Sequence, residues 1–181
     1  MTKEYCNNLA HRALTDETAF EELYEYFFPR VYNFIFARLK NISDADDVTS
    51  ITFMKMNENL ERFDPAKAAF STWLFRIAGN ALIDHVRHQN KNSETEWDET
   101  VEPAADSREE PDSIISTIET SREIFAALDK LNERERRIVE LKFWGDLDTR
   151  SIAEVLSMSE GNVRVTLHRT LGKLKNILDD V

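Results

Sequence analysis

The sequence is poor in the residues that interrupt helices and in the residue that cross-links small domains. Its 181 residues include one cysteine, four glycines and four prolines. The single cysteine, Cys6, excludes an internal disulfide and a cysteine-based metal cluster. Because glycine and proline are scarce while apolar and charged residues recur at helical spacing, and no convincing alternating strand pattern is present, the sequence predicts an all-α protein.

Long apolar runs are also missing. The N-terminal segment lacks the apolar core of a signal peptide, and no uninterrupted apolar stretch approaches the roughly 20 residues that a membrane span needs. We therefore expect a cytoplasmic protein.

The chain has no excess of basic charge, since its net charge is −11. A negative protein is at first sight a poor partner for the phosphate backbone of nucleic acids. The acidity is concentrated in the middle, however, because residues 1–90 carry −3, residues 91–123 carry −8 and residues 124–181 carry zero. The two flanking parts are therefore close to neutral, and nucleic-acid binding stays open.

The N-terminal part predicts a compact helical bundle over residues 10–90. Apolar residues at i, i+3, i+4 and i+7 indicate a first helix after Asp16, a second that restarts at Pro29, a third that follows a capping residue at Ser43, and a fourth over residues 70–89. Residues 91–120 are polar and acidic with two of the four prolines, so they predict a linker between two small domains.

The C-terminal part, residues 121–181, predicts a second helical domain. Asn132 can cap one helix, with Glu135 at its third position, and Gly145 can end it. Asp148 can cap a short helix, which is followed by a three-residue turn and a longer helix after Ser159. This is the spacing of a helix-turn-helix, whose second helix lies in the DNA major groove.

The second helix of this unit supplies candidate DNA-binding side chains. Its apolar residues hold one face against the domain and leave a polar face free. Arginine can donate two hydrogen bonds to guanine and asparagine can read adenine. The alternative is a helical hairpin with solvated charges. The candidates are Asn162, Arg164, Val165, His168 and Arg169, with Lys173 and Lys175 for phosphates.

Two sequence patterns resemble the sigma-70 family of RNA polymerase sigma factors. Residues 159–169 match the pattern S-E-G-x-V-x-x-x-L-x-R of the family's −35-binding domain, although response regulators of the LuxR type use a similar unit. Residues 70–87 read F-x-x-W-L-F-R-I-A-x-N-x-x-x-D-x-x-R, which is the more specific signature. The resemblance covers about residues 15–90 and 120–178, and the two-domain layout resembles the extracytoplasmic-function group.

The resemblance implies an alternative sigma factor that binds core polymerase and promoter DNA. Its polymerase partners would be the clamp helices of the largest subunit and the flap, and an anti-sigma protein is a further partner that the group allows. The clamp contact would involve Asp44, Asp46, Asp47 and Phe53. The aspartates also have a simpler explanation, because acidic groups stabilise a helix N-terminus by about 0.3–1 kcal/mol.

The resemblance also assigns the −10 element and its melting to the fourth helix and the loop before it. The implied residues are Asp64, Lys67, Phe70, Trp73, Arg76, Asn80, Arg87 and His88. For the two aromatic residues, packing in the core is the alternative. The chain departs from the family at Leu74, where housekeeping relatives carry a second aromatic residue, and at Ser50 and Ile51, where many relatives carry Gln-Glu.

The sequence also raises three other questions, which concern independence from polymerase, the role of the linker and a metal site. The helix-turn-helix could serve a regulator that works independently of core polymerase. The acidic linker could imitate nucleic acid within the polymerase or act as a solvated tether. His85 and His88 could be two ligands of a metal ion, but no third ligand has a suitable spacing. We therefore expect that the protein is not an enzyme and binds neither a metal nor a cofactor.

Overall fold

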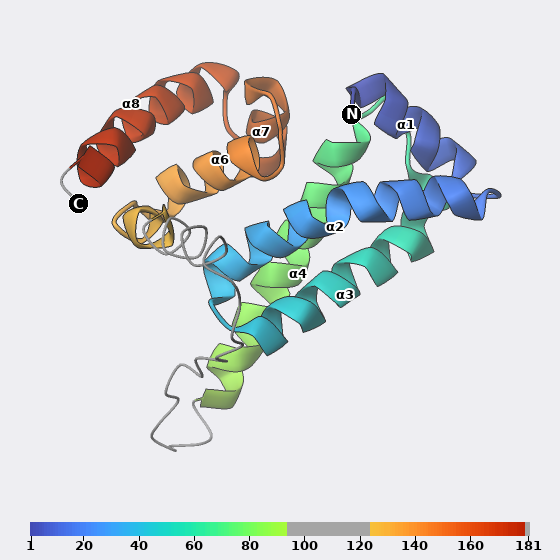
Figure 1. Ribbon diagram of the computed structural model, residues 1–181, viewed down its shortest axis with the longest axis horizontal. Helices are drawn as coiled ribbons and strands as arrows, with labels where there is room; N and C mark the ends of the chain where they lie inside the picture. The colour runs from blue at the N-terminus through green and yellow to red at the C-terminus, as the bar shows by residue number, and fades with distance from the viewer. Residues whose placement is uncertain (94–123, 180–181) are drawn as a thin grey trace, which may run out of the picture.

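The computed structural model describes residues 1–93 and 124–179, and the described residues form two helical bundles (Figure 1). The predicted linker lies mostly outside the described residues. The first bundle contains α1 (Lys3–Arg12), α2 (Glu17–Leu39), α3 (Ile42–Asn59), a short 3-10 turn (Leu60–Arg62) and α4 (Phe70–Ser93). The second contains a helical stretch at 124–129, then α6 (Glu133–Phe143), α7 (Thr149–Leu156) and α8 (Glu160–Asp179). No strand occurs in these ranges, which confirms the all-α prediction.

Helix α2 runs without a break through Pro29, so the prediction of two separate helices there is wrong. Proline removes one backbone donor, but Pro29 is exposed, and the carbonyl that loses its partner can meet water. The apolar face continues across it through Leu23, Phe27 and Val31, all buried. Packing of this face therefore keeps the helix continuous.

The predicted start of the third helix needs a smaller correction. Asn41, rather than Ser43, is the N-cap of α3, and its side-chain oxygen accepts a hydrogen bond of 3.0 Å from the amide of Asp44. Asparagine is as effective a cap as serine. The helix therefore begins two residues earlier than Ser43 indicated.

Helix α1 was not predicted from the sequence, although it forms part of the first bundle. It begins at the cap Thr2 and buries Cys6, Leu9 and Ala10 against α2 and α4. The side chain of Asn7 accepts a hydrogen bond of 2.8 Å from the amide of Phe70, the first residue of α4. Helix α1 therefore satisfies one of the orphan donors at the start of α4.

The second bundle follows its predicted caps closely. Asn132 and Glu135 form a reciprocal capping box at the start of α6. Gly145 follows that helix, and a Cβ there would lie 2.6 Å from the carbonyl oxygen of Leu141, so glycine is required by the close approach of the chain. The tight turn then leads directly into the cap of α7 at Asp148.

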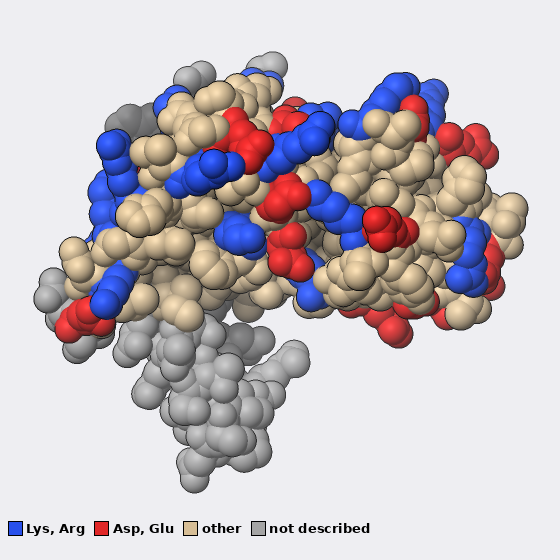
Figure 2. Space-filling model, turned by 90° about the horizontal axis from the view of Figure 1, so that it is seen from above, with Lys and Arg blue, Asp and Glu red and all other residues tan. Residues whose placement is uncertain are grey.

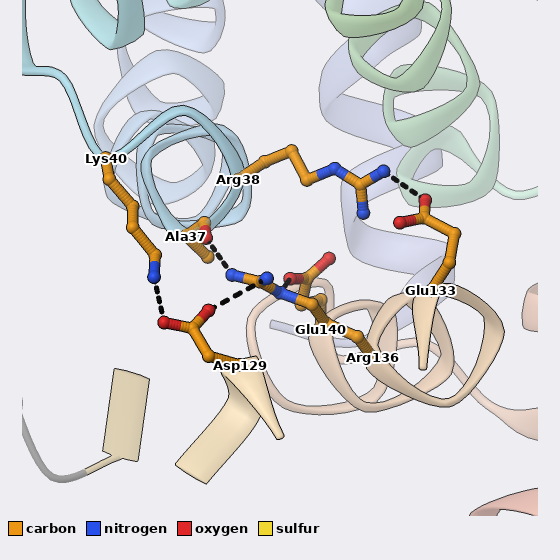
Figure 3. A network of polar contacts seen from close by, with 7 residues as sticks. All are labelled: Ala37, Arg38, Lys40, Asp129, Glu133, Arg136 and Glu140. Carbon is orange, nitrogen blue, oxygen red and sulfur yellow. Dashed lines mark hydrogen bonds and ion pairs between the residues drawn. The ribbon is translucent and has the colours of Figure 1, made fainter. Parts of the chain in front are cut away.

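The two bundles pack directly against each other. Helix α7 lies beside α4, and the ring of Phe36 in α2 meets that of Phe125 at a centroid distance of 5.7 Å in an edge-on arrangement. The buried apolar residues of both bundles belong to one cluster, and the ion pairs of Arg38 with Glu133 and of Lys40 with Asp129 also join the bundles (Figure 3).

Candidate nucleic-acid interface

Helices α7 and α8 form the predicted helix-turn-helix. The Asp148 carboxylate caps α7 through a 2.7 Å bond from the amide of Ser151. Ser157 adopts a left-handed conformation with φ of 53° and ends the helix, and the hydroxyl of Ser159 accepts from the amide of Asn162 at 3.3 Å to start α8. Buried Val163 and Leu167 fix α8 against the domain.

All seven side chains predicted for the recognition helix are exposed. Five of them, at positions 162, 164, 165, 168 and 169, lie in the first half of α8, which is the half that a helix-turn-helix presents to base edges. The guanidinium of Arg164 donates a hydrogen bond of 2.7 Å to the carboxylate of Glu160 on the preceding turn. The exposed set is Asn162, Arg164, Val165, His168, Arg169, Lys173 and Lys175.

Lys173 has a partner within the domain that sequence reasoning did not assign. Its ammonium group bonds to the carboxylate of Glu135 in α6, and this bond is the main cause of the lowered pKa of Glu135. Glu135 also closes the capping box of α6. Lys173 therefore braces α8 against α6, and its contribution to a phosphate contact would require exchange of this partner.

On α4, Phe70 and Trp73, the two aromatic residues implied for the −10 element, differ in burial. Phe70 has no exposed surface and meets Phe27 and Phe63 at centroid distances of 5.3 and 5.4 Å, so the core-packing alternative describes it. Trp73 is only partly buried and rests on Phe63 and Phe70. Trp73 is therefore the aromatic side chain of this pair that a base could reach.

Trp73 lines a groove of about 440 Å³ between α3 and α4. Asn80 lies further along the same groove, opposite Asn59 and Arg62. A partly buried indole beside amide and guanidinium groups can stack on a base and bond to its edge. Asn59 and Arg62 were not predicted as site residues. The feature of the sequence that could have indicated them is their polar character in the last turns before the loop.

The remaining −10 candidates lie in three different places. Asp64 and Lys67 contact each other within the loop before α4, with 3.4 Å between Nζ and Oδ2. Arg76 points to the second bundle, where it donates to the carbonyl oxygen of Glu154 at 2.9 Å. Arg87 lines a small cavity between the bundles, and His88 is exposed on α4. The structure thus brings Trp73 and Asn80 together but not the whole predicted set.

The acidic residues near the start of α3 are also divided. Asp46 and Asp47 are exposed, whereas Asp44 accepts a 3.0 Å bond from Gln89 and lies 3.5 Å from a ring nitrogen of His85, both on α4. Phe53 is buried, with its ring 4.8 Å from that of Tyr24, so it supports this surface from beneath and cannot itself contact a partner in this arrangement.

Two exposed apolar residues on the same helix were missed. Ile51 is 38% and Met54 is 55% exposed, and both lie outside the buried stripe of α3. Positions 47, 51 and 54 follow one another at helical spacing, so Asp47, Ile51 and Met54 share one face. We call Asp46, Asp47, Ile51 and Met54 the α3 surface.

The second bundle carries an apolar groove that sequence reasoning also missed. It has a volume of about 440 Å³ and lies between the 124–129 stretch, α6 and the C-terminal half of α8. Phe143 is 62% exposed at its edge, and Leu171 and Leu178 are also exposed. We call this the α6–α8 groove. A surface of this kind is typical of a site that receives an apolar helix.

On the one face of the molecule that Figure 2 draws, charges of both signs are mixed. On the face in Figure 2, lysine and arginine side chains alternate with aspartate and glutamate, without a continuous basic stripe. Within the described residues, no group of three or more His, Cys, Asp or Glu side chains could hold a metal ion, and no helix is long and apolar enough to cross a membrane.

Comparison with known proteins relates both bundles to one family. Residues 23–92 match the model described as Sigma-70 region 2, and residues 121–174 match Sigma-70, region 4. The ECF RNA polymerase sigma factor SigW of Bacillus subtilis is 28% identical over 174 residues, which cover 92% of each chain. The ECF RNA polymerase sigma factor RpoE of Cereibacter sphaeroides is 28% identical over 88% of this chain and 86% of that one.

Solved structures share the fold. The structure of CnrH in complex with the cytosolic domain of CnrY matches with a TM-score of 0.66 at 23% identity, covering 98% of this chain and 97% of that one. The sigma factor RpoE of Bartonella quintana, in complex with the anti-sigma factor NepR, matches with a TM-score of 0.65 at 18% identity, over 88% and 96% of the two chains. With both regions matched along more than half of its length, the chain belongs to the sigma-70 family of RNA polymerase sigma factors, in the extracytoplasmic-function group.

Proposed function

We propose that this sigma factor binds core RNA polymerase in the cytoplasm, reads a −35 and a −10 promoter element, and helps to open the DNA. The observation that carries this proposal is the exposed polar face of α8, in a domain matched by region 4, within a chain whose other domain matches region 2. We assign region 2 to residues 10–90, together with α1, and region 4 to residues 121–181. The polymerase carries out RNA synthesis, and this chain supplies recognition.

The −35 element would be read by the N-terminal half of α8 in the major groove. Arg164 and Asn162 are the side chains best placed for base edges, since arginine pairs with guanine and asparagine with adenine. The amides at the start of α8, beside Ser159, offer donors to a phosphate. Arg169 lies a turn and a half further along and suits the backbone.

The −10 element would be read by the groove between α3 and α4. Trp73 offers a stacking surface worth about 1–3 kcal/mol for an unstacked base, and Asn80 offers an amide to its edge. Leu74, at the position where housekeeping relatives have a second aromatic residue, is buried. With one accessible aromatic side chain in this pair, opening would depend strongly on the promoter sequence.

Polymerase contacts would use one surface on each domain. The α3 surface, with two carboxylates beside two exposed apolar side chains, suits the clamp helices of the largest subunit. The α6–α8 groove suits the flap, because its exposed Phe143 and Leu178 would be covered by an apolar helix. Affinity for the promoter would then come from the assembled complex rather than from a strongly basic chain.

An anti-sigma protein would be the natural inhibitor of such a factor. The sigma factor RpoE of Bartonella quintana, which has a similar fold, is bound to the anti-sigma factor NepR in its solved structure, and CnrH is bound to the cytosolic domain of CnrY. The α6–α8 groove is the surface that such an inhibitor would compete for with the flap.

Transcription with purified components tests the proposal. Core polymerase with this chain should produce transcripts that core polymerase alone does not, and the chain alone should bind the same DNA weakly. The alternative is a helix-turn-helix regulator that acts independently of core polymerase. That alternative predicts tight binding to duplex DNA by the chain alone and no association with core polymerase.

A further inference from the structure

A polar crevice lies where α4 of the first bundle meets α7 of the second. It has a volume of about 190 Å³, and Arg76, Asn80, Arg137 and Ser157 are among the residues that line it. Arg76 and Asn80 lie one turn apart on α4, Arg137 comes from α6, and Ser157 ends α7. Each of these side chains carries N–H or O–H donors. Three helices therefore contribute donors to one small space, which we call the α4–α7 crevice.

The charge of Arg137 is not neutralised within the described part of the chain. Its side chain is half-buried, yet its guanidinium makes no hydrogen bond or ion pair with another described residue. Its Nη2 atom lies 3.5 Å from the point that a Cβ on Gly79 would occupy, so the guanidinium rests against the backbone of α4. Removing a charge from water costs free energy unless a counter-charge or hydrogen bonds compensate for it. This position therefore favours an anionic ligand.

Arg76 has donors to spare beside Arg137. One of its N–H groups donates to the carbonyl oxygen of Glu154, near the end of α7, at 2.9 Å. A guanidinium carries five N–H donors, so this bond leaves most of them available. The planar fork of arginine matches the oxygens of a phosphate group, which it can bind through two parallel hydrogen bonds. The pair of arginines is therefore suited to a phosphate anion.

The local charge balance distinguishes an anion site from simple neutralisation of a helix end. A helix C-terminus carries a charge of about −0.5, which nearby arginines can offset. The carboxylate of Glu154 adds one negative charge, but Arg150 offsets it, with 3.5 Å between nitrogen and oxygen. The two positive charges of Arg76 and Arg137 therefore leave an excess of about +1.5 at the end of α7. The chain as a whole carries −11, so this excess is local.

The carboxylates on the other side of Arg137 are also neutralised. Arg137 lines a second small cavity together with Glu133 and Glu140. Glu133 pairs with Arg38, and Glu140 pairs with Arg136 at 2.9 Å. Among the described residues, each carboxylate that lines these two cavities therefore has an arginine of its own, and the charge of Arg137 stays available to a ligand.

The size of the α4–α7 crevice limits the ligand. A volume of about 190 Å³ is roughly six times the ~30 Å³ that a water molecule occupies in the liquid, and it lies below the range of about 300–1,000 Å³ that is usual for drug-sized ligands. We infer that the crevice binds a small phosphate anion, phosphate or diphosphate, between Arg76 and Arg137. Asn80 and Ser157 supply further hydrogen bonds. Such binding requires neither promoter nor polymerase, so it stands apart from the proposed function.

Two substitutions with matched controls test the site. Arg137→Gln removes the unneutralised charge and keeps a long polar side chain, and Arg134→Gln makes the same change at an exposed position of α6 outside the crevice. Asn80→Asp places a negative charge in the crevice without a change of size, and Asn57→Asp does so at an exposed position of α3. All four positions are at least partly exposed, so the variants should fold, and thermal unfolding would verify this.

Calorimetric titration of the full chain with phosphate, and separately with diphosphate, measures binding. Wild type, R134Q and N57D should bind with the same affinity. R137Q and N80D should bind about tenfold more weakly or worse, since the first loses a charge-assisted contact and the second opposes the anion. Wild type that binds neither probe at millimolar concentration, or equal affinity in wild type and all variants, would overturn the inference.

The amide resonances of the chain locate the bound anion. During titration with phosphate, the amides of Gly79, Asn80 and Ser157 should shift together, with the dissociation constant that calorimetry gives. Shifts confined to the start of α8, beside Ser159, would show that the free amides of a helix N-terminus bind the anion instead. That result would refute the assignment to the crevice.

A thymidine dinucleotide distinguishes a small anion from the backbone of nucleic acid, because its one phosphodiester lies between two sugars. The crevice has no room for the sugars, so the dinucleotide should bind about tenfold more weakly than phosphate, or worse. Equal affinity for the dinucleotide and phosphate would mean that the site receives a nucleic-acid backbone, which contradicts a small-anion site.

Discussion

Arg164 is the residue on which specificity for the −35 element depends most in this account. Its guanidinium is exposed and held only by Glu160 on its own helix. Arg164→Ala should reduce transcription from a −35-dependent promoter by about tenfold or more, since a bidentate arginine contact discriminates by about 1–3 kcal/mol. Transcript yield on matched promoter templates measures this.

The control for this prediction is Arg164→Lys, which keeps the charge but not the two-donor fork. It should recover binding to phosphates but little discrimination between bases. If both variants lose core-polymerase affinity as well, Arg164 is needed for the structure of the domain and the assignment to base reading is wrong.

Asp148 links a local cap to the pH dependence of stability. Partial burial would raise its pKa, but hydrogen bonds from Lys3 and Ser151 outweigh this and hold the pKa at about 2, below the ordinary 3.8. A lowered pKa favours the charged form in the folded state, so its contribution is complete above about pH 4 and is lost as the pH falls toward 2.

The variant Asp148→Asn keeps a capping oxygen without the titrating group. Wild type should therefore lose more stability than D148N between about pH 5 and about pH 3, measured by urea unfolding. Asp148→Ala should lower stability by about 0.5–2 kcal/mol at neutral pH, because the cap of α7 is removed. Equal acid sensitivity of wild type and D148N would contradict the assigned pKa.

Trp73 and Phe70 should differ in what their removal damages. Phe70→Ala should cost about 3–5 kcal/mol of stability, because the ring is completely buried. Trp73→Ala should instead lower transcription from duplex promoters more than from pre-melted ones, in a chain that stays folded. An equal loss on both templates would argue that Trp73 has no part in opening.

At the scale of the elements, α1 stabilises the helix that carries the proposed −10 residues. Asn7→Ala removes the acceptor for the amide of Phe70 and should lower stability by about 1 kcal/mol, as loss of a cap does. The neighbouring Asn8→Ala is the control, because Asn8 is exposed. Urea unfolding of both variants would test this, and equal effects would exclude a specific role of Asn7.

Elements with local signals were predictable from the sequence. The caps Asn132, Asp148 and Ser159 act within three residues of themselves, so their sequence positions were sufficient. Pro29 misled the prediction because a local cost was outweighed by long-range packing. Helix α1 escaped prediction because its short apolar face becomes meaningful only once α2 and α4 are in place.

In the candidate site too, the features with a local sequence pattern were predictable and those that depend on packing were not. The polar face of α8 followed from helical periodicity and is exposed as expected. Buried and accessible apolar residues on α3 and α4 could not be distinguished from periodicity alone, because apolar side chains of α3 also lie outside its buried stripe. Phe53 and Phe70 lie inside, whereas Ile51 and Met54 lie outside.

At the scale of the whole molecule, the arrangement of the two domains was beyond sequence reasoning. The polar contacts that join the domains pair Arg38 with Glu133, Lys40 with Asp129, and Arg136 with the carbonyl of Ala37, across 89 to 99 positions of the chain. The family resemblance describes each domain separately.

The central claim is that this chain confers promoter recognition on core polymerase, and sequencing of transcript starts tests it most directly. Genomic DNA from the source organism would be transcribed by its core polymerase, with and without the purified chain. The account predicts new start sites that share two sequence blocks, at the −35 and −10 positions, and weakening of the upstream block's influence by Arg164→Ala. Start sites identical to those of core polymerase alone would contradict it.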